Sequence, residues 1–362
     1  MTDEIKYRIY NIVLQPTTFC NLSCSYCYLP DKEQKLKMTL DITTKLSNDI
    51  KQEGRNVNLL WHAGEPMACG LSHFKELLSP FKENEFVTHI IQTNATLITQ
   101  DWCNFFKENN FHVGVSIDGP DWANSNRIDR KGRQVFHKTI DGINTLKQND
   151  IKFIVIAVVD FSTLDKAKEL YQFFCELGCD WVGINIEESE SANKRSVCDD
   201  ERVSIFWKEI FNSWYANPKI EIREISSTLS WFEDINNNEQ FNLSDYKIDL
   251  FPSIGYNGDF VLLSPELLGG VAKNYNNFIV GNVKTKSIFE IEKTVETINY
   301  VNDFSKGVLM CKEECDYFSF CRGGQASNKF YETGQLAITE TIYCRNSKKR
   351  VVDGIIHQLN FK

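Results

Sequence analysis

Apolar, β-branched runs alternate with longer stretches of helical periodicity over about the first 215 residues. Several of the runs are apolar almost throughout, as is typical of a parallel sheet covered by helices. Six strand–helix repeats are too few for a closed eight-stranded barrel, so we predict an open, partial (β/α)6 barrel. The predicted strands are 9–15, 57–62, 86–92, 111–117, 151–159 and 180–186. The predicted helices lie near 39–53, 71–82, 99–109, 134–149, 163–177 and 200–215.

The pattern changes after the predicted barrel, which we assign to residues 1–215. Residues 216–250 include an Asn- and Asp-rich stretch at 234–248 and predict a linker or bridging segment. Residues 251–362 predict a smaller unit with short strands and a short helix near 287–296. Four cysteines stand near the end of this unit, in a stretch too short for a core of its own. We therefore expect that stretch to need a metal in order to fold.

The composition narrows the class of protein. Of the 362 residues, 42% are apolar and 25% are charged, which is near the average of globular proteins. Forty basic against forty-nine acidic residues give a net charge of −9, so we do not expect nucleic-acid binding. No apolar run is long enough to span a membrane, and the charged N-terminus does not resemble a signal peptide. We expect a cytoplasmic protein with reduced cysteines.

Polar residues gather where the predicted strands end. In a parallel sheet the carboxyl ends of the strands meet at one edge, where ligands bind. The first strand leads into a cysteine cluster, and four others end in polar loops. We therefore predict one site at this edge, lined by the cysteines and by His62-Ala63-Gly64-Glu65-Pro66, Gln92-Thr93-Asn94, Ser116-Ile117-Asp118-Gly119-Pro120 and Asn185-Ile186-Glu187-Glu188.

The cysteine cluster has the spacing C-x3-C-x2-C, at Cys20, Cys24 and Cys27. Three thiolates on one short loop can hold three corners of a cubane iron–sulfur cluster and leave one iron open. A structural zinc site is the alternative. Such sites usually combine two separated pairs of ligands, which three cysteines within eight residues do not provide.

With Tyr26 before its third cysteine, this loop resembles that of the radical S-adenosylmethionine (SAM) enzymes. The resemblance implies that the amino acid end of SAM chelates the open iron. The segment His62–Pro66 is similar to the Gly-Gly-Glu-Pro motif of that family, with Ala63 in place of its first glycine. It implies that His62, Gly64 and Glu65 bind the cofactor and that Glu65 accepts a hydrogen bond from the SAM amine. A plain turn after a strand is the alternative for this motif alone.

Ser116 to Pro120 with the following Arg127 resembles the segment that binds the SAM carboxylate and ribose in peptide-modifying members. An arginine suits a carboxylate because its planar fork can bind both oxygens. The resemblance implies cofactor-binding roles for Ser116, Asp118 and Arg127. Asp118 could instead start a turn. Gln92 and Asn94 are further candidates at the mouth, and Asn94 could equally cap a helix.

The C-terminal cysteines have the spacing C-x3-C-x5-C-x22-C, at Cys311, Cys315, Cys321 and Cys344. Four thiolates suit one fully ligated cluster, and a structural zinc site is the alternative. The stretch resembles the SPASM extension of radical SAM peptide maturases, which binds auxiliary [4Fe–4S] clusters. Full SPASM domains hold two clusters, but residues 251–270 contain no cysteine. We therefore expect one auxiliary cluster.

Finer likeness points to the XYE- and Grr-type maturases, which form three-residue cyclophanes in ribosomally made precursor peptides. It covers residues 10–346 and rests on Asn185–Glu188, Ser264–Gly269, Gly281–Val283, Cys321–Lys329 and Thr339–Cys344. The resemblance implies a carbon–carbon bond between an aromatic ring and the β-carbon of a residue two positions later.

We expect Glu187 or Glu188 to accept the ring proton, although either could bind the peptide or form a surface ion pair. The auxiliary cluster is the expected electron acceptor, and flavodoxin or ferredoxin is the expected reductant. Fewer than twenty residues precede Cys20, so we expect no leader-binding domain there.

Two alternatives stay open. One is another radical SAM peptide modification, namely a thioether or ether cross-link, epimerisation or sulfatase-type Ser or Cys oxidation. The other is a zinc-stabilised binding protein.

Overall fold

The computed structural model describes residues 5–195, 197, 200–237 and 241–359. Its centre is a ten-stranded sheet with the order β12-β11-β10-β2-β3-β4-β5-β6-β7-β8. Neighbouring strands from β10 through β2 to β8 run parallel. In the pair formed by β2 and β3, for example, Leu14 lies opposite Trp61. The parallel strands of the barrel are β2 (Asn11–Leu14), β3 (Val57–Trp61), β4 (Val87–Thr93), β5 (His112–Ser116), β6 (Phe153–Val159), β7 (Trp181–Ile186) and β8 (Glu221–Ile222).

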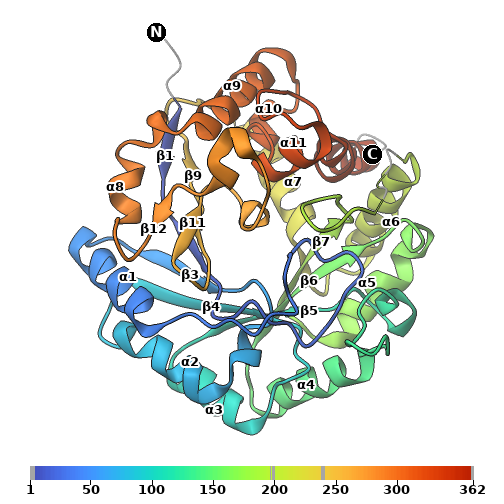
Figure 1. The fold of residues 1–362 in the computed structure, drawn as a ribbon. Coiled ribbons are helices and arrows are strands. Elements are labelled where there is room, and N and C mark those ends of the chain that lie inside the picture. Colours follow the sequence, from blue (N-terminus) through green and yellow to red (C-terminus); the bar gives the residue numbers. More distant parts are fainter. Residues whose placement is uncertain (1–4, 196, 198–199, 238–240, 360–362) are drawn as a thin grey trace.

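Six helices form an arc outside these strands (Figure 1). In the first of them, Ile42, Leu46 and Ile50 recur every four residues and are fully buried against the sheet. That helix ends at Gly54, whose left-handed backbone (φ 67°) donates its N–H to the carbonyl of Ile50. The six helices are α1 (Leu40–Glu53), α2 (Leu71–Leu78), α3 (Gln100–Glu108), α4 (Phe136–Gln148), α5 (Ala167–Leu177) and α6 (Arg202–Ala216). The predicted strands and helices of the barrel are therefore confirmed to within a few residues.

The sheet continues past the predicted end of the barrel. The strand β10 (Ser253–Ile254) pairs in parallel with β2, and β11 (Asp259–Val261) and β12 (Gly281–Asn282) follow as antiparallel neighbours. Close to the N-terminus, β1 (Lys6–Arg8) pairs in parallel with β9 (Lys247–Asp249) and forms a separate two-stranded sheet. One hydrophobic core contains residues of both halves, so the boundary expected at residue 250 divides neither the sheet nor the core.

The segment predicted as a linker contains the 14-residue helix α7 (Arg223–Asn236). Its first half packs through Ile225 and Thr228, which are buried. The orange and red C-terminal elements then close the side of the ring that lies opposite α3 and α4 (Figure 1). These elements are α8 (Ile288–Glu292), α9 (Asn299–Glu314), α10 (Phe318–Cys321), α11 (Ala326–Thr333), α12 (Ile342–Cys344) and α13 (Arg350–Leu359). Within the described residues, no helix combines the length and apolar character that crossing a membrane requires.

Candidate active site

The cysteine loop follows β2 and is fixed by backbone hydrogen bonds. Ser23 and Ser25 donate their N–H groups to the carbonyls of Ile128 and Asn126, at 2.7 and 3.0 Å. The N–H of Leu22 and the side-chain amide of Asn94 point at the sulfur of Cys20, at 3.4 and 3.9 Å. These donors would stabilise a thiolate at Cys20, although burial outweighs the Leu22 contact and raises the pKa of that thiol.

The donor set of this loop fits a cubane cluster. Cys20, Cys24 and Cys27 are reduced and partly buried. Burial raises the pKa of Cys20 to about 12 and also raises the pKa of Cys24, so an ion must displace their protons. Within the described ranges, no three Cys, His, Asp or Glu side chains converge on one metal ion, as a zinc site would need. A cubane does not need such convergence, because each cysteine binds a different iron.

Gly64 and Glu65 join the loop to the sheet. A Cβ on Gly64 would lie 2.6 Å from the carbonyl oxygen of Thr17, and the backbone of Gly64 is left-handed, with φ 86°. The buried carboxylate of Glu65 accepts hydrogen bonds from Met67 N–H, Thr93 Oγ1 and Asn94 N–H, at 3.1, 2.7 and 2.8 Å. Glu65 therefore ties the end of β4 to its own turn. Burial raises its pKa, although the three donors oppose that rise.

Asp118 and Arg127 meet at Tyr26. The hydroxyl of Tyr26 donates to Asp118 Oδ2 at 2.6 Å and accepts from Arg127 Nη1 at 2.7 Å. Asp118 Oδ1 also accepts the N–H of Val158 and lies 3.9 Å from the guanidinium of Arg127. Burial raises the pKa of Asp118, and Arg127 opposes the rise. The Nε of Arg127 is buried without a partner, which leaves one donor for a carboxylate such as that of SAM.

The remaining predicted cofactor residues lie at the same strand ends. Gln92 donates to Ser116 Oγ at 2.8 Å, which couples β4 to β5. Asn94 Oδ1 accepts the N–H of Thr96 at 3.0 Å, so it closes a local turn. The helix that follows, α3, begins only at Gln100, so Asn94 does not cap it. His62 Nε2 lies 3.2 Å from the hydroxyl of Tyr28, and its Nδ1 is buried without a partner.

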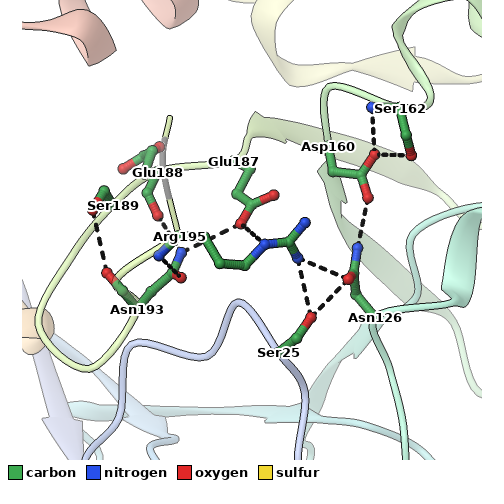
Figure 2. Close-up of polar contacts among 9 residues, drawn as sticks. All are labelled: Ser25, Asn126, Asp160, Ser162, Glu187, Glu188, Ser189, Asn193 and Arg195. Atoms are coloured by element: carbon green, nitrogen blue, oxygen red, sulfur yellow. Dashed lines mark hydrogen bonds and ion pairs between the residues drawn. The ribbon is translucent and has the colours of Figure 1, made fainter. Parts of the chain in front are cut away.

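Glu187 belongs to an ion-paired network beside the cysteine loop (Figure 2). Its Oε1 lies 3.2 Å from Nε of Arg195. Arg195 in turn donates to Ser25 Oγ and Asn126 Oδ1, at 3.0 and 2.7 Å. Burial raises the pKa of Glu187, and Arg195 opposes the rise. The carboxylate therefore holds an arginine against the loop that carries the cysteines.

Glu188 points away from that network, toward the C-terminal unit. Its Oε2 accepts a hydrogen bond from Asn328 Nδ2 at 2.7 Å. Burial raises the pKa of Glu188 to about 7, and the nearby charge of Glu266 adds to the rise. The charge of Glu188 also acts on Tyr343, which lies near Cys321 and Cys344.

Sequence reasoning missed several polar residues of this region. Glu190 and Glu266 lie beside Glu188, and Tyr28 lies beside Cys27. Asp160 follows β6 and accepts Asn126 Nδ2 at 2.6 Å (Figure 2). The rule that located the other strand-end residues also applies to Asp160, which comes directly after Val159. Glu266 lies in the short 3-10 turn Pro265–Leu267, inside the segment Ser264–Gly269 on which the resemblance partly rests, but the sequence assigned it no role of its own.

The four C-terminal cysteines line one cavity of about 210 Å³. A hydrogen bond from Cys321, together with the amide and hydroxyl of Thr341, lowers the pKa of Cys344 to about 6 although burial opposes that shift. Lys329 Nζ lies 3.7 Å from the sulfur of Cys311. The four predicted ligands therefore line one cavity, in which Lys329 and Thr341 favour the thiolate of Cys344 while burial raises the pKa of Cys311.

Comparison with known proteins identifies the family. The model of the radical SAM superfamily matches residues 14–174. An uncharacterized protein of Synechocystis is 34% identical to this chain and covers 96% of it, and the chain covers 91% of that relative. The chain belongs to the radical SAM superfamily, and it is an enzyme that uses a [4Fe–4S] cluster and SAM.

Two further matches extend over most of the chain. A serine-type anaerobic sulfatase-maturating enzyme of Bacteroides thetaiotaomicron is 26% identical, with 90% of this chain and 84% of the relative covered. The structure of native anSMEcpe with bound AdoMet and Cp18Cys peptide superposes with a TM-score of 0.78 at 22% identity, covering 98% of this chain and 100% of that chain. The predicted fold class, a radical SAM barrel with a SPASM-like C-terminal extension, is confirmed.

Proposed function

We propose that this enzyme modifies a ribosomally made precursor peptide by joining an aromatic ring carbon to the β-carbon of a nearby residue. The names of its relatives support a peptide substrate, because sulfatase-maturating enzymes modify a residue of a protein. The position of Glu188 carries the proposal. The pKa of this carboxyl group is raised, and its charge acts on Glu190, which in turn acts on Tyr28 near Cys27. The charge of Glu188 also acts on Tyr343, near the C-terminal cysteines.

The chain's own residues would hold the cofactors as follows. Cys20, Cys24 and Cys27 hold the SAM-binding cluster, and the four C-terminal cysteines hold one auxiliary [4Fe–4S] cluster. When bound, these cofactors supply hydrogen-atom abstraction from an unactivated carbon and an acceptor for one electron. The unpartnered Nε of Arg127 suits the SAM carboxylate. The other SAM-binding residues we propose are His62, Gly64, Glu65, Gln92, Asn94, Ser116 and Asp118.

Cross-linking removes two hydrogens from the peptide. One leaves the β-carbon as a hydrogen atom, and the other leaves the ring as a proton together with one electron. Of the two predicted proton acceptors, Glu188 suits this task better than Glu187. A carboxylate with a pKa of about 7 can take up a proton near neutral pH, whereas Glu187 is occupied by Arg195.

The test is an anaerobic incubation of the reconstituted enzyme with SAM, a reductant such as flavodoxin or ferredoxin, and the precursor peptide. The expected product is lighter by two hydrogen atoms per ring, and its backbone resists fragmentation inside the ring. A peptide of unchanged mass, alongside ample 5′-deoxyadenosine, would exclude cross-linking of that peptide.

Sulfatase-type oxidation is the second candidate, because a serine-type sulfatase-maturating relative matches over 90% of this chain. Oxidation of a serine to an aldehyde also removes two hydrogen atoms, so mass alone does not separate the two reactions. A hydrazine reagent does separate them, since it traps an aldehyde and leaves a carbon–carbon cross-link unchanged. Residues 251–270, where the ligands of a second auxiliary cluster would be expected, contain no cysteine. This shortage of cluster ligands favours the cross-linking candidate over sulfatase-type oxidation.

A further inference from the structure

Lys329 is a buried lysine beside the C-terminal cysteines. It lies on α11, and its side chain is fully buried, with 0% exposure. Its ammonium group donates to the carbonyl oxygen of Ile338 and lies 3.7 Å from the sulfur of Cys311. The centroid of the Phe304 ring lies 5.7 Å from the same nitrogen. The charge of Lys329 is therefore held against one of the walls of the cysteine cavity, which Cys311 lines.

This buried charge has no carboxylate partner. Among the residues that the structure describes, no aspartate or glutamate forms an ion pair with Lys329. Lys349, which lines the cavity itself, differs in this respect because it pairs with Glu340. A buried charge is costly unless an opposite charge offsets it, and lysine is rarely buried fully without one. The thiolates of the cavity are the groups placed to offset the charge of Lys329.

Helix α9 leaves room for the ammonium group. Gly307 stands in the middle of this 16-residue helix, and a Cβ there would lie 2.8 Å from Lys329 Nζ and close to the carbonyl oxygen of Leu336. Its backbone is helical, so a left-handed conformation is not the reason for glycine. A glycine inside a helix is destabilising relative to alanine. Two helices therefore contribute to the place of this charge, α11 with the lysine and α9 with the space.

The chemistry of the cavity gives this charge a role. The cavity of about 210 Å³ is lined by Cys311, Cys315, Cys321 and Cys344. A [4Fe–4S] cluster held by four thiolates is an anion, and taking up an electron makes it more negative. A fixed positive charge nearby therefore lowers the free energy of the reduced form more than that of the oxidised form. The same attraction acts on the thiol of Cys311, where burial raises the pKa and Lys329 opposes the rise.

We propose that Lys329 raises the reduction potential of the auxiliary cluster and so prepares it to accept the electron that leaves the peptide ring. In that step the cluster is reduced by one electron, the ring is oxidised, and the ring proton goes to Glu188. The inference rests on the proposed function for the presence of a cluster at the four cysteines. Lys329 acts through the cluster and does not touch the peptide, so it is a positioning residue.

The test is a redox titration of the reconstituted holoenzyme, followed by electron paramagnetic resonance. Added SAM changes the signal of the Cys20 cluster, which identifies the other signal as that of the auxiliary cluster. Lys329→Met removes the charge and keeps an unbranched side chain. We expect the ratio of oxidised to reduced auxiliary cluster at a fixed potential to rise tenfold or more, which lowers its reduction potential by about 59 mV or more. The potential of the Cys20 cluster should not change.

Two further variants make this test specific. Lys306→Met is the matched control, because Lys306 lies on the same helix as Cys311 but is exposed and pairs with Asp303. It should leave both potentials unchanged. Gly307→Ala keeps the lysine and displaces its ammonium group, so it should lower the auxiliary potential by less than Lys329→Met does. An unchanged auxiliary potential in Lys329→Met, or an equal fall in Lys306→Met, would overturn the proposal.

Iron analysis separates this inference from the proposed function. A parent enzyme with about four irons per chain and no second cluster would refute the proposed function and the inference together. A second cluster whose potential does not depend on Lys329 would refute the inference alone. Loss of the second cluster from both Lys329→Met and Gly307→Ala would also contradict the inference, because Lys329 would then serve the assembly of the site and not its potential.

Discussion

Glu188 carries a raised pKa because it is buried beside another carboxyl group. As a proton acceptor it must be ionised, so cross-linked product should increase as the pH rises through about 7. The effect of rising pH on the stability of the fold has the opposite sign. The folded state binds this proton more tightly than the unfolded chain, so the fold loses stability as the pH rises through about 7. A pH profile of cross-linking that is flat between pH 6 and 8, after correction for the rate of SAM cleavage, would contradict the role.

Substitution separates the two predicted acceptors. Glu188→Gln should slow cross-linking roughly a hundredfold or more and leave 5′-deoxyadenosine formation within a few-fold of the parent. Glu187→Gln should act differently, because it frees Arg195 from its ion pair beside Ser25 and Asn126. We expect that change to weaken SAM binding, seen as a higher KM for SAM. Equal loss of cross-linking in both variants would leave Glu188 without a special role.

The turn at residues 63 and 64 offers a matched pair of variants. Gly64→Ala places a methyl group 2.6 Å from a backbone oxygen at a left-handed position, so it should lower stability by about 2 kcal/mol or more. Ala63 also has a positive φ, of 65°, at the position where the Gly-Gly-Glu-Pro motif that this turn resembles has its first glycine. Ala63→Gly should change stability by about 1 kcal/mol or less. Denaturant midpoints of the two variants provide the measurement, and a similar loss in both would contradict the close approach.

At the scale of elements, the C-terminal cavity predicts separable cofactor sites. Cys315→Ala should remove the auxiliary cluster and reduce iron from about eight to about four atoms per chain. Because the cavity that Cys315 lines contains no residue of the Cys20 loop, SAM cleavage should continue while cross-linking falls. Cys20→Ala is the counterpart, and it should abolish SAM cleavage. Iron analysis and 5′-deoxyadenosine assays follow both variants. Loss of SAM cleavage in Cys315→Ala would show that the two sites do not fold independently.

The barrel elements could be predicted from the sequence because their apolar spacing matches the period of the element. Helix α1 is an example, with Ile42, Leu46 and Ile50 on one face. Helix α7 was missed because serine, threonine and asparagine interrupt its apolar positions and suggest a loop. Strand β8 has only two residues, too few for any alternation to register. Local pattern therefore identifies long elements with one buried face and misses short or polar ones.

The candidate site shows the same limit. Glu65 and Asp118 were predicted because each lies in a motif that comes soon after a barrel strand and resembles a SAM-binding segment. Asn328 and Glu266 reach the same region from the C-terminal unit, and only the tertiary fold brings them to Glu188. Contacts between residues so far apart along the chain cannot be predicted from a single sequence.

At the scale of the whole molecule, the continuous sheet makes the barrel dependent on the C-terminal unit. A fragment of residues 1–250 lacks β10 and exposes the edge of β2, whose Ile12, Val13 and Leu14 are fully buried in the intact chain. We expect the fragment to aggregate, as seen by size-exclusion chromatography, under conditions in which the full chain stays monodisperse. A soluble, folded fragment would support the division at residue 250 that the sequence suggested.

The most direct measurement of the central claim follows one hydrogen atom. A precursor peptide is fully deuterated on the β-carbon of the residue two positions after its aromatic residue, and the intact enzyme turns it over under anaerobic conditions. The account predicts one deuterium in 5′-deoxyadenosine and a cross-linked peptide that has lost one deuterium and one ring hydrogen. Product that keeps every deuterium, or that reacts with hydrazine as an aldehyde, would contradict carbon–carbon cross-linking.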